Sequence, residues 1–524
     1  MLAQVNLGNL VAIGASLVIC TVAFYVIQIV RYELKVRRIP GVRAPSLASN
    51  PLSGLIWIVE AGRAQRRNQF LTHYNSFFDT SGTPESPHCV ELQIKPCARF
   101  LLTRDPEHIK AILAGQFSDF GKGEQFHRLW RPFLGDSIFT TDGPLWHDSR
   151  TLIRPMFIKD RVSDLATFDK GATTLITKFP PSGQTVDIMD LFYRMTLDVT
   201  TDFLLGESVD SLNNPQNEFS NAFSEVQKLQ MFMTIVGPLE SFIPRWRYNR
   251  RIRVLDKFVM PYIEQALALP REELEKISNS DKNFTFLHSI ARYTRDPRVL
   301  RDQLIAVLIA GRDTTAATLS WAIYELSRYP EKFKKLHDEV VNAVGRTQSP
   351  TYEDLKNITY LRHTINETLR LYPAVPYNLR TALENTTIPG APGQPPIAVA
   401  EGDVVVYSLL SMQRRRDLYP PISEKFEDPE VFSPERWDNW SPKPWQYVPF
   451  NGGPRICVGQ NFALTEIAYC LTKILQKFDR LEYRGDWYAQ RHEAEIVGKP
   501  SQGVPVALYE KVREVARYSQ QRVG

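Results

Sequence analysis

Cys457 lies in a glycine-rich loop, Phe450–Gly459, directly before a run that favours a helix from Gln460 to Leu475. Backbone amides at a helix start stabilise a thiolate, and a thiolate is a ligand for haem iron that promotes O–O cleavage. Glycines let a backbone approach a flat macrocycle closely. We expect Phe450 to shield the sulfur and Arg455 to pair with a haem propionate. The remaining cysteines are expected to be ordinary free thiols: Cys20, Cys89, Cys97 and Cys470.

A second pattern, Ala310–Thr315, lies within a long apolar helix expected over Leu304–Ser327. Glycine, acid and hydroxyl residues form helices poorly, so the pattern predicts a local helix opening with a free carbonyl and room for a diatomic molecule. The neighbouring acid and alcohol, Asp313 and Thr314, can relay protons. The alternative is a threonine bonded back to its own helix beside a solvated aspartate. The presence of Cys457 favours the relay.

Two charged or aromatic pairs have helical spacing. Glu367 and Arg370 share one helix face, and taken alone they read as a surface ion pair of about 0.3 kcal/mol. Trp146 and Arg150 point the same way, and both are donors able to bind one carboxylate. The alternative for the second pair is a core tryptophan beside a surface arginine.

The loop around Cys457 matches the haem-binding signature of the cytochrome P-450 superfamily, Phe-x-x-Gly-x-Arg-x-Cys-x-Gly, at every fixed position. The other motifs follow in family order. The resemblance implies a mainly α fold with a minor β lobe, of the α+β class. Within the superfamily, the motifs at 310–316 and 450–466 look like those of fungal alkane and fatty-acid hydroxylases. Position 310 is Ala rather than Glu, so the ester link to haem used by some animal fatty-acid hydroxylases is not expected.

The resemblance implies a role for each motif residue. Cys457 would be the iron ligand, and Asp313 and Thr314 would deliver protons to bound dioxygen. The residues implied in haem binding are Trp146, Arg150, Arg380, Arg455, Phe450 and Gly459. The triad implied to support the haem loop is Glu367, Arg370 and Arg436. Candidates for substrate contact are Ala306, Ala310 and Val375.

One stretch departs from the family pattern. Ser411–Glu430 holds a basic run, Arg414–Arg416, and a double proline, Pro420 and Pro421.

The amino-terminal segment has no charged residue before Arg31, and its apolar run is long enough to cross a membrane as a helix. A cleaved signal peptide would have basic residues before a shorter run. The basic residues that follow place the chain's bulk in the cytosol. We therefore expect a single-pass anchor at 1–30, a basic proline-containing hinge at 31–50, and a haem domain at 51–524. The expected location is the endoplasmic reticulum membrane.

The composition is that of an ordinary globular protein, with 43 % hydrophobic and 23 % charged residues among 524. Five cysteines exclude a disulfide scaffold, and a net charge of +5 gives no argument for nucleic-acid binding. Residues 31–70 hold eight basic and two acidic residues. The basic surplus therefore belongs to the membrane-proximal segment, where it sets topology and meets anionic lipid.

The chain has no dinucleotide-binding glycine motif in a βαβ setting, so its electrons must come from elsewhere. We expect a separate NADPH-dependent flavin reductase as partner, with O2 and a lipophilic substrate such as a fatty acid or alkane. One alternative is a tailoring oxidase of a secondary-metabolite pathway. A haem-thiolate isomerase is disfavoured because Asp313 and Thr314 are intact. A non-catalytic haem carrier would give these two residues no purpose.

Overall fold

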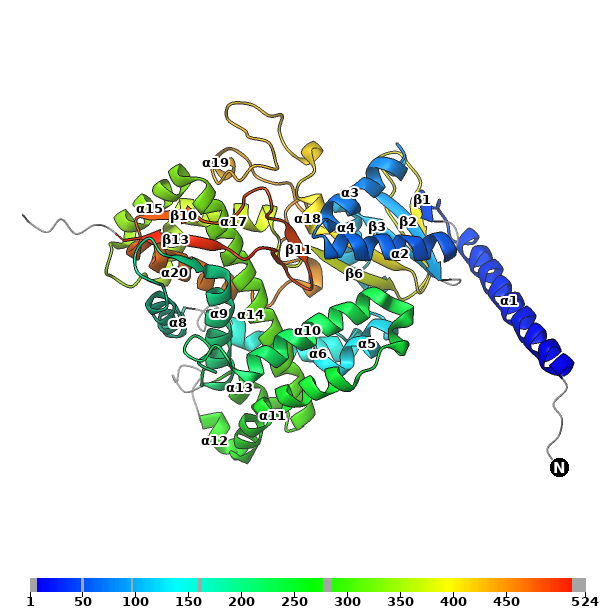
Figure 1. Ribbon diagram of the computed structural model, residues 1–524, viewed down its shortest axis with the longest axis horizontal. Coiled ribbons are helices and arrows are strands. Elements are labelled where there is room, and N and C mark those ends of the chain that lie inside the picture. Colours follow the sequence, from blue (N-terminus) through cyan, green and yellow to red (C-terminus); the bar gives the residue numbers. More distant parts are fainter. Residues whose placement is uncertain (1–6, 49–50, 96–97, 159–162, 277–284, 511–524) are drawn as a thin grey trace, which may run out of the picture.

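The computed structural model describes residues 7–48, 51–95, 98–158, 163–276 and 285–510. Figure 1 shows a β-rich end and a larger helical part. The first helix extends away from the β-rich end. The described helices are α1 Leu7–Arg37, α2 Pro51–Arg66, α3 Phe70–Ser81, α4 Pro106–Lys110, α5 Glu124–Leu134, α6 Gly143–Ile153, α8 Ala166–Thr177, α9 Ile188–Leu205, α10 Glu218–Val236, α11 Trp246–Ala268, α12 Arg271–Lys276, α13 Phe286–Tyr293, α14 Pro297–Arg328, α15 Pro330–Val344, α16 Tyr352–Asn357, α17 Thr359–Leu371, α18 Leu409–Met412, α19 Arg436–Asn439 and α20 Gln460–Lys477.

Among the described residues, the strands form one six-stranded sheet and three smaller sheets. The large sheet has the order β1-β2-β3-β9-β6-β4, and the others pair β10-β13-β5, β11-β12 and β7-β8. The β3–β9 pair is parallel, with Phe100 opposite Val404. The strands are β1 Ser46–Ala48, β2 Cys89–Lys95, β3 Ala98–Thr103, β4 Phe120–Gly121, β5 Thr185–Asp187, β6 Tyr377–Ala382, β7 Thr386–Ile388, β8 Ile397–Val399, β9 Val404–Ser408, β10 Arg480–Tyr483, β11 His492–Ala494, β12 Gly498–Pro500 and β13 Pro505–Tyr509. The predicted class, mainly α with a minor β lobe, is confirmed.

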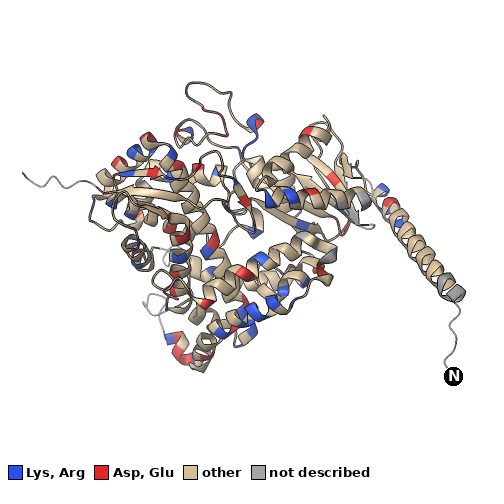
Figure 2. Ribbon diagram, viewed as in Figure 1, with Lys and Arg blue, Asp and Glu red and all other residues tan. Residues whose placement is uncertain are grey.

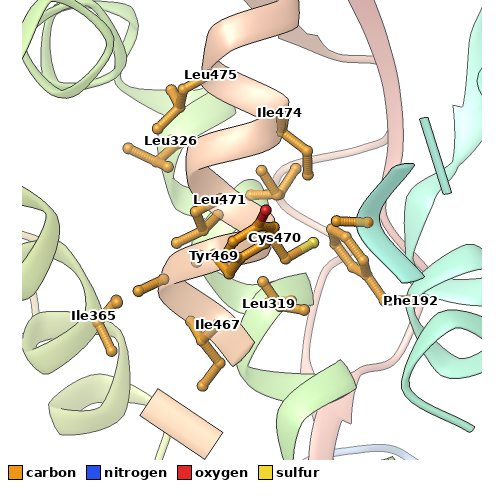
Figure 3. Packing of buried hydrophobic residues seen from close by; sticks show 14 of the residues in the cluster. Phe192, Leu319, Leu326, Ile365, Ile467, Tyr469, Cys470, Leu471, Ile474 and Leu475 are labelled. Atoms are coloured by element: carbon orange, nitrogen blue, oxygen red, sulfur yellow. The ribbon is translucent and has the colours of Figure 1, made fainter. Parts of the chain in front are cut away.

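Helix α14 runs through the centre of the helical part and is buried along most of its length. It begins seven residues before the expected start at Leu304, because Pro297 occupies the first turn and the Asp296 side chain accepts a hydrogen bond from the Arg298 amide. It ends before Tyr329 and Pro330, as expected. Its apolar side packs on α20, where Leu319 and Leu326 lie close to the side chains of that helix (Figure 3).

Helix α1 is longer than the predicted anchor. It continues through the expected hinge to Arg37, because Tyr32 and Val36 are buried with Ile39 against Ala398 and Ala400 of the β-rich end. The chain breaks only at Pro40 and Gly41. Among the described residues, Ala12–Arg37 is the one helix long and apolar enough to cross a membrane, with mean hydropathy 2.3. Figure 2 shows its outer part free of charge.

A buried ionic network joins the end of α1 to the large sheet. Arg99, with no exposed surface, pairs with Asp403 at 2.8 Å and with Glu91 at 2.6 Å. The Tyr32 hydroxyl accepts from Arg99 Nε at 2.8 Å and donates to Asp403. Arg43 then bridges Glu91 and Glu33 of α1. One residue of the basic surplus at 31–70, Arg43, is therefore used to hold α1 against the large sheet.

Replacing Tyr32 by phenylalanine is expected to weaken this docking by about 1–3 kcal/mol, because Asp403 and Arg99 lose a buried hydrogen-bond partner. Limited proteolysis of the membrane-reconstituted protein near residues 38–45 should become faster. Tyr25→Phe is the matched control, since Tyr25 is half-exposed on the outer part of α1. Equal cleavage rates in the two variants would contradict the docking role.

Candidate haem-thiolate site

Cys457 lies between a single 3-10 turn, Gly453–Arg455, and the start of α20. Its amide donates to the Phe450 carbonyl at 3.0 Å, which closes the loop on itself. Cys457 keeps accessible surface, although protein atoms gather closely around its thiol. Desolvation by the surroundings raises the pKa of the thiol, while the Gly459 N–H bonded to the sulfur and the nearby Arg150 oppose the rise. The loop thus presents one sulfur with a backbone donor aimed at it, as a thiolate ligand requires.

The glycine at 453 is explained by chain packing. Its φ is +64°, and a Cβ there would lie 1.9 Å from the Leu113 carbonyl oxygen. A Cβ on Gly452 would lie 2.6 Å from the Trp445 ring. These two glycines are therefore required by the protein's own backbone and by Trp445, in addition to the close approach to a macrocycle that we expected.

Three cations gather beside the cysteine loop and fit the acidic edge of haem. Burial, together with Arg380 and Arg455, holds the pKa of Lys122 well below its usual value. Burial and Arg380 likewise lower the pKa of Arg455 to about 10, although Asp142 accepts from Arg455 at 2.6 Å. Arg455 Nε is buried and has no hydrogen-bond partner among the described residues. A cluster with more cations than acids and an unused donor suits two propionates.

Trp146 and Arg150 lie at this site with different contacts. Trp146 is buried in α6, and the Arg455 guanidinium lies 4.7 Å from its ring centre. Arg150 donates to the Ile456 carbonyl at 2.9 Å, next to Cys457. Arg380 donates to Asn378 and to the Leu379 carbonyl from β6. The structure therefore brings all of these predicted residues to one site.

Glu367, Arg370 and Arg436 form a fully buried group below the loop. Arg370 donates twice to the Glu367 carboxylate, at 2.8 Å each, and Arg436 Nε lies 3.3 Å from Oε1. Trp437 and the Ser433 amide also donate to this carboxylate. The predicted pair is thus no surface ion pair, because every member lies in the interior.

Gln413 connects this group to the cysteine loop. Its carbonyl accepts from Arg370 at 3.2 Å, and its side-chain oxygen accepts from the Val448 amide at 3.0 Å. Val448 lies two residues before Phe450. The buried charges therefore hold the segment that leads into Cys457.

The predicted opening of α14 does not occur, and this expectation is wrong. The helix is continuous, and the Thr314 hydroxyl donates to the Ala310 carbonyl at 2.6 Å. Asp313, however, is buried rather than solvated, as that alternative had required. The acid is therefore buried, and the adjacent alcohol, Thr314, is partly buried.

Asp313 belongs to a charged cluster between α10, α14 and the β11–β12 hairpin. Burial raises its pKa, and the Arg312 guanidinium, 3.2 Å from Oδ1, opposes that rise. Lys499 of β12 acts on Asp313 electrostatically and pairs with Glu495 at 2.9 Å and with Glu493 at 3.6 Å. The acid can therefore hold a proton at pH values where a free aspartate has lost it.

The three substrate candidates differ in accessibility. Ala306 has no exposed surface, whereas Ala310 and Val375 keep some. Of the alanine pair, Ala310 is the one that borders open space. The basic run of the divergent stretch is paired with acids, Arg414 with Glu430 and Arg416 with Asp428.

Lys122 and Asp142 were not among the predicted site residues. Asp142 accepts from Arg455 and from the amides of Lys122 and Gly123. Lys122 donates to Asn378 across 256 positions of sequence. No spacing rule links such distant residues, so only the folded chain reveals them.

The chain was compared with known proteins. The family model described as Cytochrome P450 matches residues 62–503. "Cytochrome P450 monooxygenase pvhE" of Talaromyces variabilis is 45 % identical over 94 % of this chain and 95 % of that protein. "Cytochrome P450 52A1" of Candida tropicalis is 43 % identical over 72 % of each, and "Cytochrome P450 52A12" of Debaryomyces hansenii is 33 % identical over 93 % and 96 %.

The family match covers the cysteine loop, the cationic cluster and the Ala310–Thr315 motif of α14. It accounts for one accessible sulfur at a helix start, with buried cations beside it. The chain belongs to the cytochrome P450 family, and it is a monooxygenase whose cofactor is haem iron with a cysteine thiolate ligand.

Proposed function

We propose that this protein is a membrane-anchored monooxygenase that hydroxylates C–H bonds of a lipophilic, fatty-acid-like or alkane-like substrate. The observation that carries the proposal is the Cys457 loop, whose accessible sulfur receives a backbone N–H and lies near buried cations that suit the haem propionates. The motif resemblance to alkane and fatty-acid hydroxylases supports the substrate class. Bound haem supplies the oxygen activation and C–H oxidation.

The protein's own residues hold the cofactor and move protons. Cys457 Sγ would ligate the haem iron, and Lys122, Arg380 and Arg455 would neutralise the propionates. Arg150 holds the Ile456 carbonyl next to Cys457, and Trp146 packs against the Arg455 guanidinium. Asp313 carries a proton on its carboxyl group, and the adjacent Thr314 hydroxyl passes it toward the oxygen side. Ala310 and Val375 leave room for an alkyl chain.

Electrons would come from NADPH through a separate flavin reductase. We place the protein in the endoplasmic reticulum membrane as a single-pass protein with a cytosolic catalytic domain. The uncharged outer part of α1, followed by basic residues from Arg31 onward, supports this topology. Consumption of NADPH with added reductase and substrate separates this proposal from an isomerase, which would need neither.

A tailoring oxidase of a secondary-metabolite pathway is the second candidate. It is favoured by one comparison, since the relative matched over 94 % of this chain is not a 52A protein. Substrate-induced difference spectra over fatty acids, alkanes, terpenoids and polyketides distinguish the two. We expect fatty acids or alkanes to bind, and the first proposal fails if none of them does.

Replacing Asp313 by asparagine is expected to lower the product-forming rate by about 10²-fold, because the proton donor is lost while the packing is kept. Oxygen consumption should continue with release of peroxide instead of product. The matched control is Asp302→Asn, another acid of α14 with a raised pKa, which faces Arg301 and the Asp136 amide. A product rate within about twofold of the parent would contradict the role of Asp313.

A further inference from the structure

A ladder of aromatic rings leads from α14 to the protein surface. Trp321 lies seven residues after Thr314 in one continuous helix, which places it about 10 Å further along the axis and within about 20° of the same face. Its ring centre is 5.5 Å from that of Tyr324, and Tyr324 is 5.8 Å from Trp487. Trp487 is 36 % exposed. These rings connect the part of α14 that follows Thr314 with solvent.

Two further tyrosines contact the ladder. Tyr372 stacks on Trp321 at 3.9 Å, with only 2° between the ring planes. Tyr483 lies 5.3 Å from Tyr324 and 4.1 Å from Trp487, so the outer part of the ladder has two parallel routes. Every ring-centre separation is below 7 Å, the outer limit for directly packed aromatic pairs.

Oxidised tyrosine and tryptophan rings release a proton, and the polar neighbours of these rings can accept it. Tyr372 donates its hydroxyl proton to Glu325 Oε1 at 2.5 Å, and Glu325 is buried. The Trp321 N–H donates to the Gly498 carbonyl at 3.3 Å. The Arg328 guanidinium lies 5.4 Å from the Tyr324 ring centre and 5.5 Å from that of Trp487. Its charge disfavours radical cations and favours neutral radicals that have released their proton.

We propose that Trp321, Tyr324 and Trp487, with Tyr372 and Tyr483, form an electron-transfer route that removes oxidising equivalents from the active site when no substrate is oxidised. This rests on the proposed monooxygenase function as the source of those equivalents. The protective activity is separate from hydroxylation, and its external co-substrate is a soluble thiol that reaches Trp487.

The electron balance closes with that thiol. Trp321 gives one electron to the oxidised site and then takes one from Tyr324. Tyr324 in turn takes an electron from Trp487, so the electron vacancy moves outward to Trp487. A thiol restores Trp487. Two thiols become one disulfide and supply two electrons and two protons. The oxygen atom at the site would take up these two electrons and two protons and leave as water.

The electron vacancy is finally localised on Tyr372. Its ring exchanges electrons with Trp321, and its phenol proton moves to Glu325 when it is oxidised. On reduction the proton returns. A tyrosyl radical at this position is therefore the expected signature of the route.

A photochemical experiment tests the route without turnover. The full-length holoprotein, in a Cys20→Ser, Cys97→Ser background, carries Tyr488→Cys labelled with a ruthenium photo-oxidant beside Trp487; Tyr488 is 87 % exposed. A flash with a cobalt(III) ammine quencher produces the oxidant, and freeze-quench electron paramagnetic resonance follows the radical. We expect the Tyr372 part of the tyrosyl signal to be lost in Tyr372→Phe and in Trp321→Phe, so that the total signal falls, while Tyr324 and Tyr483 on the outer part of the ladder keep the remainder.

Two further variants separate conduction from packing. Trp321→Tyr keeps an oxidisable ring and should retain the signal, whereas Trp130→Phe, a buried tryptophan stacked on Phe126, should leave it unchanged. An equal signal in Trp321→Phe and the parent overturns the proposal, as does loss of the signal in Trp130→Phe. Since the flash requires no substrate, reductase or turnover, either result leaves the monooxygenase proposal standing.

A hydroperoxide challenge tests the protective role. Without substrate, Trp321→Phe should lose its haem absorbance faster than the parent and than Trp130→Phe, and added glutathione should slow the loss only where the ladder is intact. Peptide mapping should find oxidation at Trp487 in the parent and much less in Trp321→Phe. Equal bleaching and equal oxidation maps would overturn the protective role.

Discussion

Cys457→Ala is expected to abolish the thiolate-type carbon monoxide difference band of the reduced protein together with all substrate hydroxylation. The sulfur is the ligand that the loop presents, and the Gly459 N–H is already directed at it. Alanine leaves the fold of the loop in place, because the backbone bond from position 457 to the Phe450 carbonyl and the conformation of Gly453 do not depend on the sulfur. Bound haem would then lack the ligand that promotes O–O cleavage.

The matched control is Cys470→Ala. Cys470 lies on α20 in the packed core, and burial raises the pKa of its thiol well above the usual value without a neighbouring donor to oppose it. Figure 3 shows its side chain among Phe192, Leu319 and Leu471. This variant should keep the shifted band even if it costs stability. Absence of the band in the unmutated protein, or its persistence in Cys457→Ala, would refute the assignment of the ligand.

The sequence predicts those site residues that lie close to one another along the chain. Cys457, Phe450, Arg455 and Gly459 fall within ten residues, and the spacing of Glu367 and Arg370 is fixed by one helical turn. Short-range geometry therefore identified them. It could not reveal that Glu367 is buried, because the groups that surround it come from residues 413–437.

The parts that were missed depend on tertiary contacts. Lys122 and Asp142 join the cationic cluster through partners far away in the chain. The predicted opening of α14 relied on intrinsic propensity, yet packing on α9 and α20 keeps the helix regular around Thr314. Helix α1 runs past the predicted end of the anchor at residue 30 for a similar reason, since burial of Tyr32 and Val36 prolongs it to Arg37.

Glu367→Gln is the second substitution with a large expected effect, a loss of about 3–5 kcal/mol in the free energy of unfolding. The carboxylate neutralises Arg370 and Arg436, which are 0 % and 1 % exposed. A neutral amide of the same shape would leave two buried guanidinium groups without their counter-charge. The amide would also present an N–H₂ to donors that now converge on the carboxylate, among them Trp437 and the Ser433 amide.

The loss should appear as a lower thermal midpoint and as earlier release of haem, because Arg370 also holds the Gln413 carbonyl that steadies the segment before Cys457. Thermal unfolding by circular dichroism and the Soret absorbance should therefore shift together. Glu401→Gln removes the exposed ion pair with Lys35 and should change stability by less than about 1 kcal/mol. Similar shifts in the two variants would show that Glu367 makes no special contribution.

The pH dependence gives an independent check on the same group. Burial opposes ionisation of Glu367, but Arg370 and Arg436 outweigh it and hold the pKa of its carboxyl below the usual value. A lowered folded-state pKa gives stability that is fully present above the unfolded value of about 4.3 and is lost as the pH falls through the folded value. The parent should therefore lose stability on acidification in that range, and Glu367→Gln should lose less. Parallel acid curves for parent and variant would mean that the carboxylate is not the charge that holds the two arginines in the core.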